Sequence, residues 1–303
     1  MNAVEIASVT KTFDAVTAVD DLSLIVPEGS VYGFIGPNGS GKTTTMRMIA
    51  SIFYPDRGSI RVFGRHMQGA RSEQIGYLPE ERGLYRKMTV RRVLEFYGEL
   101  RGGRKVGAEV ESWLARLGLA DWASRKVETL SKGMSQRVQF IAAVIPTPKL
   151  LILDEPFSGL DPVSADVIRA AVLELRRGGS TVILSTHDMS VAESLCDRIF
   201  MIFRGRKVLD GTLASIQDQF GNDTIRVSTA DALPPLAELP GVEKIRDLGQ
   251  VKELRMTRGC DPQQVLEVLV RRTRVTGFSV VQPSLNDIVV RIAGPASEEA
   301  KVA

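Results

Sequence analysis

The stretch of sequence that decides the fold of this chain reads Gly36-Pro37-Asn38-Gly39-Ser40-Gly41-Lys42-Thr43. It matches a phosphate-binding loop, in which glycines let backbone N–H groups approach phosphate oxygens without an intervening Cβ. An apolar run at residues 31–35 precedes the loop and a helical pattern follows it to about residue 53, so the positive end of a helix would face the same anion. We expect Lys42 to contact the β- and γ-phosphates of ATP and the Thr43 hydroxyl to bind Mg²⁺, and we include Thr44 among the nucleotide-binding residues.

Two acids follow a buried strand later in the chain. Residues 150–153 are continuously apolar and lead into Asp154 and Glu155. Burying acids is unfavourable unless they are paired or bind a metal, and the carboxyl ends of parallel strands border the ligand crevice of α/β folds. We therefore expect Asp154 to bind Mg²⁺, directly or through water, and Glu155 to be the general base that polarises the attacking water. The alternative is a surface turn with two solvated carboxylates.

His187 follows the next predicted strand, at residues 181–185. A single histidine is more often structural or solvated than catalytic. Its position, one strand–helix step after the acids, makes it a candidate hydrogen-bond donor to the γ-phosphate. The predicted catalytic residues are therefore Glu155, His187 and Lys42. The other histidine, His66, lies in a loop and is expected to face solvent.

The pattern of apolar residues predicts a layered α/β core with a largely parallel sheet, because short strands alternate with helices. Short strands are expected at residues 4–9, 22–26, 31–35 and 60–63, and residues 88–145 are mostly helical. From about residue 221 a second unit begins, with strands near residues 224–228, 242–246, 252–256 and 278–281. With a helix at 262–272 and a short final helix to about residue 292, this unit reads as a small, ferredoxin-like α+β domain. We expect the tail at 294–303 to be disordered.

Composition narrows the class of protein. The chain has 303 residues and a formal net charge of +3, a balance that disfavours a dedicated nucleic-acid binder. It carries two cysteines, which fits a reducing compartment. Neither a signal peptide nor an apolar run of membrane-spanning length is visible, so we expect a cytoplasmic protein. A local basic run is either a solvated face or a surface facing lipid head groups or a permease; it comprises Arg82, Arg86, Lys87, Arg91 and Arg92.

The segment that carries a family resemblance reads Leu130-Ser131-Lys132-Gly133-Met134-Ser135-Gln136-Arg137. It resembles the signature motif of the ATP-binding cassette (ABC) ATPase family, usually Leu-Ser-Gly-Gly-Gln. The resemblance implies a P-loop NTPase core with an N-terminal antiparallel β-subdomain and a helical subdomain at about residues 88–148. The ATPase domain would span residues 1–218, followed by a small α+β accessory domain at 222–293 and a flexible tail at 294–303.

The same resemblance implies further site residues. Ser131 and Gly133 open a helix that, in the family, completes the nucleotide site of the opposite subunit, which implies a homodimer or heterodimer holding two ATP molecules. Phe13 resembles the aromatic residue that stacks on adenine, although an ordinary core phenylalanine is the alternative. Residues 158–161, with Asp161, resemble the loop that crosses the dimer interface. Residues 75–80 resemble the segment that links nucleotide to permease, and Glu80 would contact ATP and Mg²⁺.

The resemblance identifies the chain as the ATP-hydrolysing subunit of a transporter, on the inner face of the cell membrane beneath a separate permease and without a nucleic-acid partner. The motifs depart from the usual residues at Lys132, Met134 and Glu80. Lys132 could add charge near a phosphate or could simply be exposed. These departures resemble a bacterial exporter branch that includes sodium-efflux and drug-efflux ATPases. An ABC ATPase acting on nucleic acid or ribosomes, and a regulator with little hydrolysis, are the rival functions. Sodium, a drug, a lipid and a peptide all remain open as cargo.

Overall fold

The computed structural model describes residues 1–67, 74–81, 83–102, 105–221, 223–235, 238–257 and 259–299. The chain divides into two compact units, Met1–Gly211 and Thr212–Ala303. This division precedes the expected one, between residues 218 and 222, because helix α7 (Leu213–Phe220) packs against α9 (Leu285–Glu299) within the second unit. Arg82, in the predicted basic run, lies outside the described residues.

The first unit is built on a six-stranded sheet. In spatial order its strands are β10 (Arg206–Gly211), β9 (Arg198–Phe203), β3 (Val31–Ile35), β8 (Thr181–Thr186), β7 (Leu150–Leu153) and β6 (Ile75–Leu78). Neighbouring strands pair in parallel except β10, which runs antiparallel to β9. The predicted largely parallel sheet is confirmed. Strands β6 and β10 were not anticipated; β6 has only four residues, and its pairing with the distant β7 defines it.

Each face of this sheet has its own core. Leu150 and Ile152 of β7 pack with α1 (Lys42–Ile49) and the N-terminal strands, whereas Leu151 and Leu153 pack with the helices of the opposite face. Successive side chains of a strand point to opposite faces, so a strand that is apolar at every position requires cover on both sides. Because β7 is covered on both faces, its four residues before Asp154 are all apolar.

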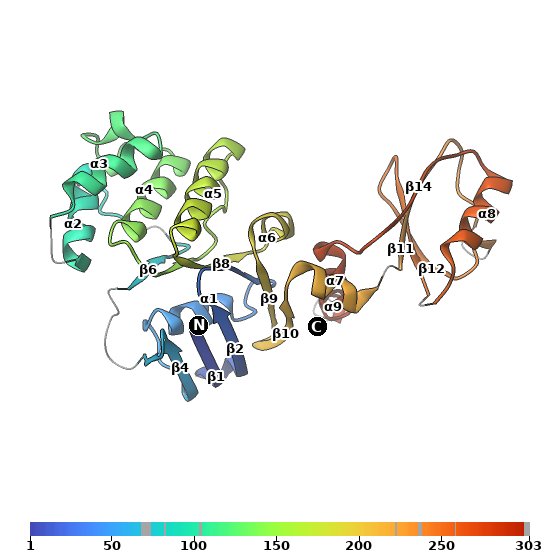
Figure 1. Cartoon of the computed structure of the whole chain (residues 1–303), viewed down its shortest axis with the longest axis horizontal. Helices are drawn as coiled ribbons and strands as arrows, with labels where there is room; N and C mark the ends of the chain where they lie inside the picture. Colours follow the sequence, from blue (N-terminus) through green and yellow to red (C-terminus); the bar gives the residue numbers. More distant parts are fainter. Residues whose placement is uncertain are drawn as a thin grey trace. The chain divides into compact units, whose positions relative to one another are not determined.

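A second, antiparallel sheet lies on the α1 side and confirms the predicted β-subdomain. Its order is β2 (Val16–Pro27), β1 (Asn2–Phe13), β4 (Arg57–Val62) and β5 (Arg65–His66). Helix α1 contacts both β2 and β4. Figure 1 shows these N-terminal strands beside α1. The phosphate-binding loop therefore leads from β3 of the parallel sheet into α1, a helix whose core residues pack with both sheets.

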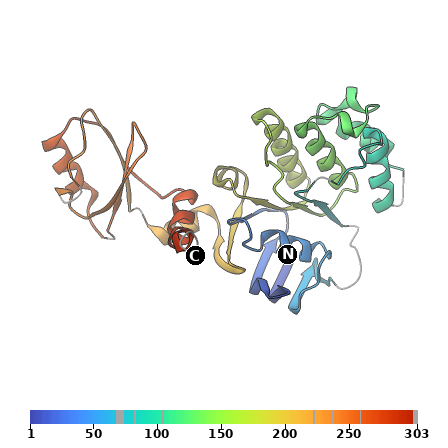
Figure 2. The ribbon, with the colours of Figure 1, turned by 180° about the vertical axis from the view of Figure 1, so that it is seen from behind.

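Helices cover the other face of the parallel sheet. They are α2 (Val90–Gly102), α3 (Gly107–Arg116), α4 (Lys132–Val144), α5 (Pro162–Arg177) and α6 (Met189–Leu195). Figures 1 and 2 both show α2 to α5 grouped together, away from the antiparallel strands. The mostly helical character expected between residues 88 and 145 is confirmed. Within the described residues, none of the helices combines the length and apolar character needed to cross a membrane.

The second unit has its own sheet and core. The sheet order is β12 (Val242–Asp247), β13 (Lys252–Met256), β11 (Thr224–Thr229) and β14 (Val275–Val281), all antiparallel. Helix α8 (Pro262–Arg272) contributes Val265 and Leu269 to the core. The order of elements follows the ferredoxin-like pattern, except that no α-helix is described between β11 and β12. Helix α9 continues to Glu299, beyond the expected start of the tail at residue 294, and residues 300–303 lie outside the description.

Candidate functional site

The phosphate-binding loop lies between the end of β3 and the start of α1. Gly36, Gly39 and Gly41 have φ angles of 147°, 75° and 108°, all in the region that disfavours side chains. A Cβ on Gly36 would collide with the carbonyl oxygen of Ile202, and one on Gly41 would lie 2.5 Å from the carbonyl oxygen of Ala18. The glycines therefore serve both the shape of the loop and its close approach to neighbouring backbone.

The loop forms one wall of a pocket of about 430 Å³. Its lining consists of Ala18, Asn38, Gly39, Ser40, Gly41, Lys42, Thr43, Thr44, Glu80 and Glu155. The fold thus brings two acids, from segments far along the chain, to a loop that opens a helix. Ala18 was not anticipated, because the carbonyl oxygen that bounds the loop leaves no signal in the type of side chain.

Lys42 is the buried cation of this pocket, with 6% of its surface exposed. Its Nζ donates hydrogen bonds to the carbonyl oxygens of Gly36 at 2.7 Å and Pro37 at 3.0 Å. Gly36 and Pro37 do not line the pocket, but their carbonyl oxygens bind the ammonium group of the lysine. Burial lowers the pKa of Lys42, and the carboxylates of Glu155, Asp154 and Glu80 partly oppose that shift. Among the described residues, the hydrogen bonds of this buried ammonium go to neutral carbonyls, so it is well suited to an anionic ligand.

Asp154 is completely buried at the end of β7. Its Oδ1 accepts hydrogen bonds from the hydroxyls of Ser185 at 2.6 Å and Thr43 at 3.2 Å. Its Oδ2 has no hydrogen-bond partner among the described residues. A buried acceptor without a donor is costly, so this oxygen fits a cation or a cation-bound water.

The described part of the chain contains no group of three or more His, Cys, Asp or Glu side chains that could hold a metal ion. Mg²⁺ does not require one, because it commonly takes one or two protein oxygens together with substrate phosphates and water. The Thr43 hydroxyl, the Asp154 carboxylate and the nearby Glu80 supply oxygens of this kind.

Glu155 has 8% of its surface exposed and adopts φ 50°, unusual for a residue with a side chain. Its backbone N–H donates to the Ser185 hydroxyl at 2.8 Å. One carboxylate oxygen, Oε2, lies 2.9 Å from Nδ1 of His187. Two of the three residues that the sequence predicted as catalytic, Glu155 and His187, are therefore in direct contact, and Glu155 lines the phosphate-binding pocket.

Ser185 was missed at the level of sequence. It lies in the six-residue strand β8, which is buried at every position. A polar side chain in such a strand is a usable signal, since a buried hydroxyl needs partners. His66, expected to be solvent-facing, is exposed, and the Nε of Arg61 donates a 3.1 Å hydrogen bond to its Nε2.

The signature residues lie outside the lining of this pocket. Ser131 caps α4 by accepting a 3.2 Å hydrogen bond from the N–H of Met134. A Cβ on Gly133 would lie 2.8 Å from the Ser164 hydroxyl and 3.4 Å from Oδ2 of Asp161, so α4 begins in close contact with α5. Asp161 caps α5, and hydrogen bonds from Ser164 lower its pKa. These residues form a second group, which we call the signature face: Ser131, Gly133 and Asp161.

Lys132 extends this face toward the preceding loop. Gly159 has φ 62°, and a Cβ built there would collide with the Nζ of Lys132. The lysine is exposed, so its ammonium group lies over the Gly159 backbone and open to solvent. The sequence had left open whether Lys132 was simply exposed or placed near a phosphate.

Phe13 is not among the residues that line the phosphate-binding pocket. It ends β1 with 38% of its surface exposed, and its ring packs edge-on against Phe53 with centroids 5.3 Å apart. The Nζ of Lys11 lies 5.3 Å from the centre of the Phe13 ring. An exposed ring next to a cation is available for stacking, and that role remains a prediction.

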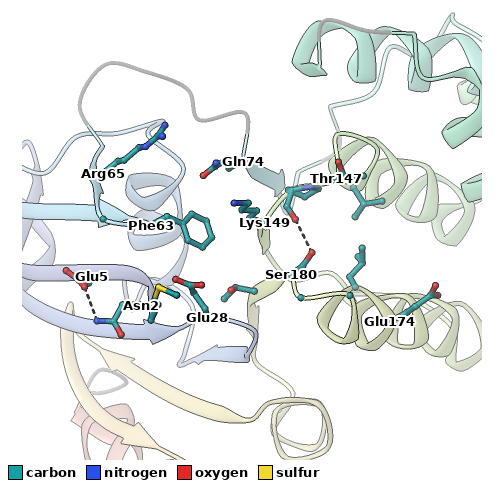
Figure 3. Close-up of a pocket in the computed structure, with 18 of the residues that line it drawn as sticks. Asn2, Glu5, Glu28, Phe63, Arg65, Gln74, Thr147, Lys149, Glu174 and Ser180 are labelled. Atoms are coloured by element: carbon teal, nitrogen blue, oxygen red, sulfur yellow. Dashed lines mark hydrogen bonds between the residues drawn. The ribbon is translucent and has the colours of Figure 1, made fainter.

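A larger pocket of about 1080 Å³ lies near the opposite ends of the parallel strands, where Lys149 precedes β7 and Ser180 precedes β8 (Figure 3). Glu28 and Arg65 also line it, so its charges are mixed. None of the predicted site residues lines it. In contrast to the smaller pocket, its lining includes no glycine-rich loop at a helix start.

Two family models match the chain. The model described as ABC transporter matches residues 19–158. The model described as ATP-binding protein DrrA1-3-like, C-terminal domain, matches residues 211–293. The first match includes the phosphate-binding loop, the signature motif at residues 130–137 and both acids, and the second corresponds to the second unit.

Curated relatives and solved structures agree with these matches. The ABC transporter ATP-binding protein YhaQ of Bacillus subtilis (strain 168) is 39% identical over 292 residues, which is 96% of this chain and 98% of the relative. The daunorubicin/doxorubicin resistance ATP-binding protein of Streptomyces peucetius is 34% identical, across 99% of this chain and 98% of the relative. A Nod factor export ATP-binding protein of Rhizobium sp. (strain N33) is also 34% identical, across 98% and 99%. A solved ATP-binding subunit of an ABC transporter superposes with a TM-score of 0.67 at 31% identity, covering 72% of this chain and 93% of that one.

Proposed function

Since this chain belongs to the family of ABC transporter ATP-binding proteins, we propose that it binds and hydrolyses ATP as a dimer to power export through a separate membrane permease. Members of the family hydrolyse ATP to drive transport and work with a membrane permease.

The observation that carries the proposal is the meeting of three distant segments at one pocket. The phosphate-binding loop, Glu80 and Glu155 line it together, and Asp154 reaches the loop through Thr43. Loop N–H groups and Lys42 would hold the β- and γ-phosphates. Without the helix start and the buried ammonium, the acids would repel a triphosphate.

We assign the Mg²⁺ ligands to Thr43 and Asp154, with Glu80 contributing an oxygen. The ion, when bound, would neutralise charge between the β- and γ-phosphates. The Oδ2 atom of Asp154 supports this assignment, because it is buried without a partner among the described residues. Glu80 carries a charge where the family usually has glutamine, and it would add to the pull on the ion.

Glu155 would accept a proton from the attacking water, which it can reach because it lines the pocket. Nδ1 of His187 would donate to the Glu155 carboxylate across the 2.9 Å contact, and with both ring nitrogens protonated Nε2 would donate toward the γ-phosphate. Lys42 would stabilise the charge that develops on the transferred phosphate. Phe13 would stack on the adenine at the rim.

The signature face supports a two-fold dimer. Ser131, Gly133 and Asp161 are brought together by α4 and α5, yet none of them lines the pocket formed by the loop of their own chain. Two copies, each closing its loop against the other's signature face, would grip two ATP molecules in an isologous interface. The helix start at Ser131 provides the N–H groups that such a grip needs.

The proposal places the first unit at the inner face of the cell membrane, where α2 would transmit closure to the permease. Relatives that are named for drug resistance and for Nod factor export favour export as the direction. The second unit would be an accessory domain of the transporter.

The proposal is tested by phosphate release from the purified protein and its Glu155→Gln variant. Loss of a general base should lower kcat by about 10²- to 10⁴-fold. The amide keeps the shape of the side chain, so ATP binding should persist and the dimer should accumulate in Mg²⁺ and ATP, as measured by light scattering.

Glu28→Gln is the matched control, because Glu28 is exposed and lines the distant larger pocket. It should leave kcat unchanged. A Glu155→Gln variant that hydrolyses ATP at the wild-type rate would remove Glu155 from the mechanism, and a wild-type protein that fails to bind ATP would remove the proposal itself.

A further inference from the structure

A single buried hydroxyl contacts both acids of the site. Ser185 is in β8, between β3 and β7 in the sheet, and has no exposed surface. Its Oγ donates to Oδ1 of Asp154 at 2.6 Å and accepts from the backbone N–H of Glu155 at 2.8 Å. No residue of the signature motif or of the phosphate-binding loop contributes to this pair of bonds.

The direction of both hydrogen bonds is fixed by chemistry. An ionised carboxylate can only accept and a backbone N–H can only donate, so the single hydroxyl proton of Ser185 must point to Asp154. The lone pairs then receive the Glu155 N–H. The hydroxyl therefore both donates a hydrogen bond and accepts one. This explains why a polar side chain is tolerated in a fully buried strand.

The two bonds have different consequences. Together with the Thr43 hydroxyl, Ser185 occupies Oδ1 of Asp154 and leaves Oδ2 as the oxygen without a partner among the described residues. At Glu155, the hydrogen bond is donated by the backbone N–H of a residue with φ 50°. This backbone conformation is unfavourable for a residue that has a side chain. The same hydroxyl thus orients one acid and stabilises the strained backbone that presents the other.

Resting on the proposed function, we infer that Ser185 is a positioning residue that orients Asp154 toward the metal and holds Glu155 in its catalytic backbone conformation. His187, two residues later on the same strand end, contacts the side chain of Glu155. The end of β8 therefore fixes both acids at the end of β7. The sequence pattern that carries this role is a serine directly after the apolar run at residues 182–184 of a strand that is buried at every position.

Ser185→Ala tests the inference with a readout independent of turnover. We expect Mn²⁺, measured by electron paramagnetic resonance as it binds to the protein–ATP complex, to bind about 10- to 100-fold more weakly, the usual loss when a residue that orients a metal ligand is removed. ATP binding in EDTA should change by less than about twofold, since Ser185 does not line the pocket. The kcat should fall by a similar 10- to 100-fold while KM changes little.

Two further variants separate positioning from packing. Ser185→Cys keeps the volume with a weaker donor and should lie between wild type and alanine, and Ser185→Thr should recover Mn²⁺ affinity if the strand accepts its methyl group. Ser30→Ala is the matched control, because Ser30 is a buried serine of the same unit whose hydroxyl donates to the carbonyl oxygen of Pro27. It should leave Mn²⁺ affinity and kcat unchanged.

The outcomes distinguish the two proposals. If the wild-type protein binds Mn²⁺ with ATP and Ser185→Ala or Ser185→Cys matches it within twofold, the role of Ser185 is wrong and the ATPase assignment stands. If the wild-type protein itself binds neither ATP nor Mn²⁺–ATP, the proposed function fails first.

Discussion

The Nδ1 atom of His187 lies 2.9 Å from Oε2 of Glu155, so an imidazole with 63% of its side chain exposed contacts a carboxylate with 9% exposed. The two residues come from the ends of neighbouring strands, β8 and β7. An ionised carboxylate only accepts, so Nδ1 of His187 must carry a proton and donate it to Oε2 of Glu155. Glu155 lines the phosphate-binding pocket, so the pair is positioned to act as a unit beside it.

This contact predicts that the two side chains are functionally coupled. His187→Ala should lower kcat by about 10- to 100-fold, while the same change in the Glu155→Gln background should cost much less, because residues that act as a unit are non-additive. Phosphate release from the four proteins of this double-mutant cycle measures the coupling. His66→Ala removes the other, exposed histidine and should be silent. Strictly additive losses would show that His187 acts independently of Glu155.

The position of Lys132 over Gly159 predicts an electrostatic contribution at the proposed dimer interface. Lys132→Ala should raise the KM for ATP by roughly two- to fivefold, the size expected of a partly solvated charge. The difference from wild type should shrink between 50 and 500 mM salt because exposed charges are screened. Lys126→Ala removes another cation, paired with Glu128, and should leave KM unchanged. An unchanged KM in Lys132→Ala at low salt would make Lys132 an ordinary surface residue.

The two cysteines are expected to differ sharply in reactivity. Burial raises the pKa of the Cys196 thiol to about 12, so at pH 8 only about one thiol in ten thousand is the reactive thiolate. Cys196 also packs against Gly33, whereas Cys260 is exposed. Iodoacetamide at pH 8 should therefore modify Cys260 first, giving one adduct by mass spectrometry, and Cys196 only after unfolding in urea. Equal labelling of both thiols in the native protein would contradict the shielding of the partly buried Cys196.

Much of the site could be read from local sequence because its chemistry is local. Residues 36–43 contain the glycines with positive φ, the N–H groups of the helix start and, directly after Gly41, the lysine. The apolar run before Asp154 indicated a strand buried on both faces, and this strand is β7. Helix caps at Ser131, Asp161 and Asp261 likewise follow from short-range hydrogen bonds.

Other features depend on contacts between distant segments. Strand β6 exists as a partner of β7, and helix α7 joins the second unit because of α9. Neither short element carries enough periodicity of its own to be recognised. Phe13 shows the same limit, since its position relative to the pocket depends on Phe53 and the end of a long strand.

The sequence by itself determined which residues the proposed chemistry uses: the loop and Lys42 for phosphate, Asp154 and Glu155 for metal and water, and a signature helix start at Ser131. Only the tertiary structure decided how they are grouped, with the acids at the loop, the signature residues outside its pocket and Ser185 joined to both acids. The physical reason is range. Backbone conformation and helix caps are set within a few residues, whereas hydrogen bonds across parallel strands join positions that the chain separates by 30 residues or more.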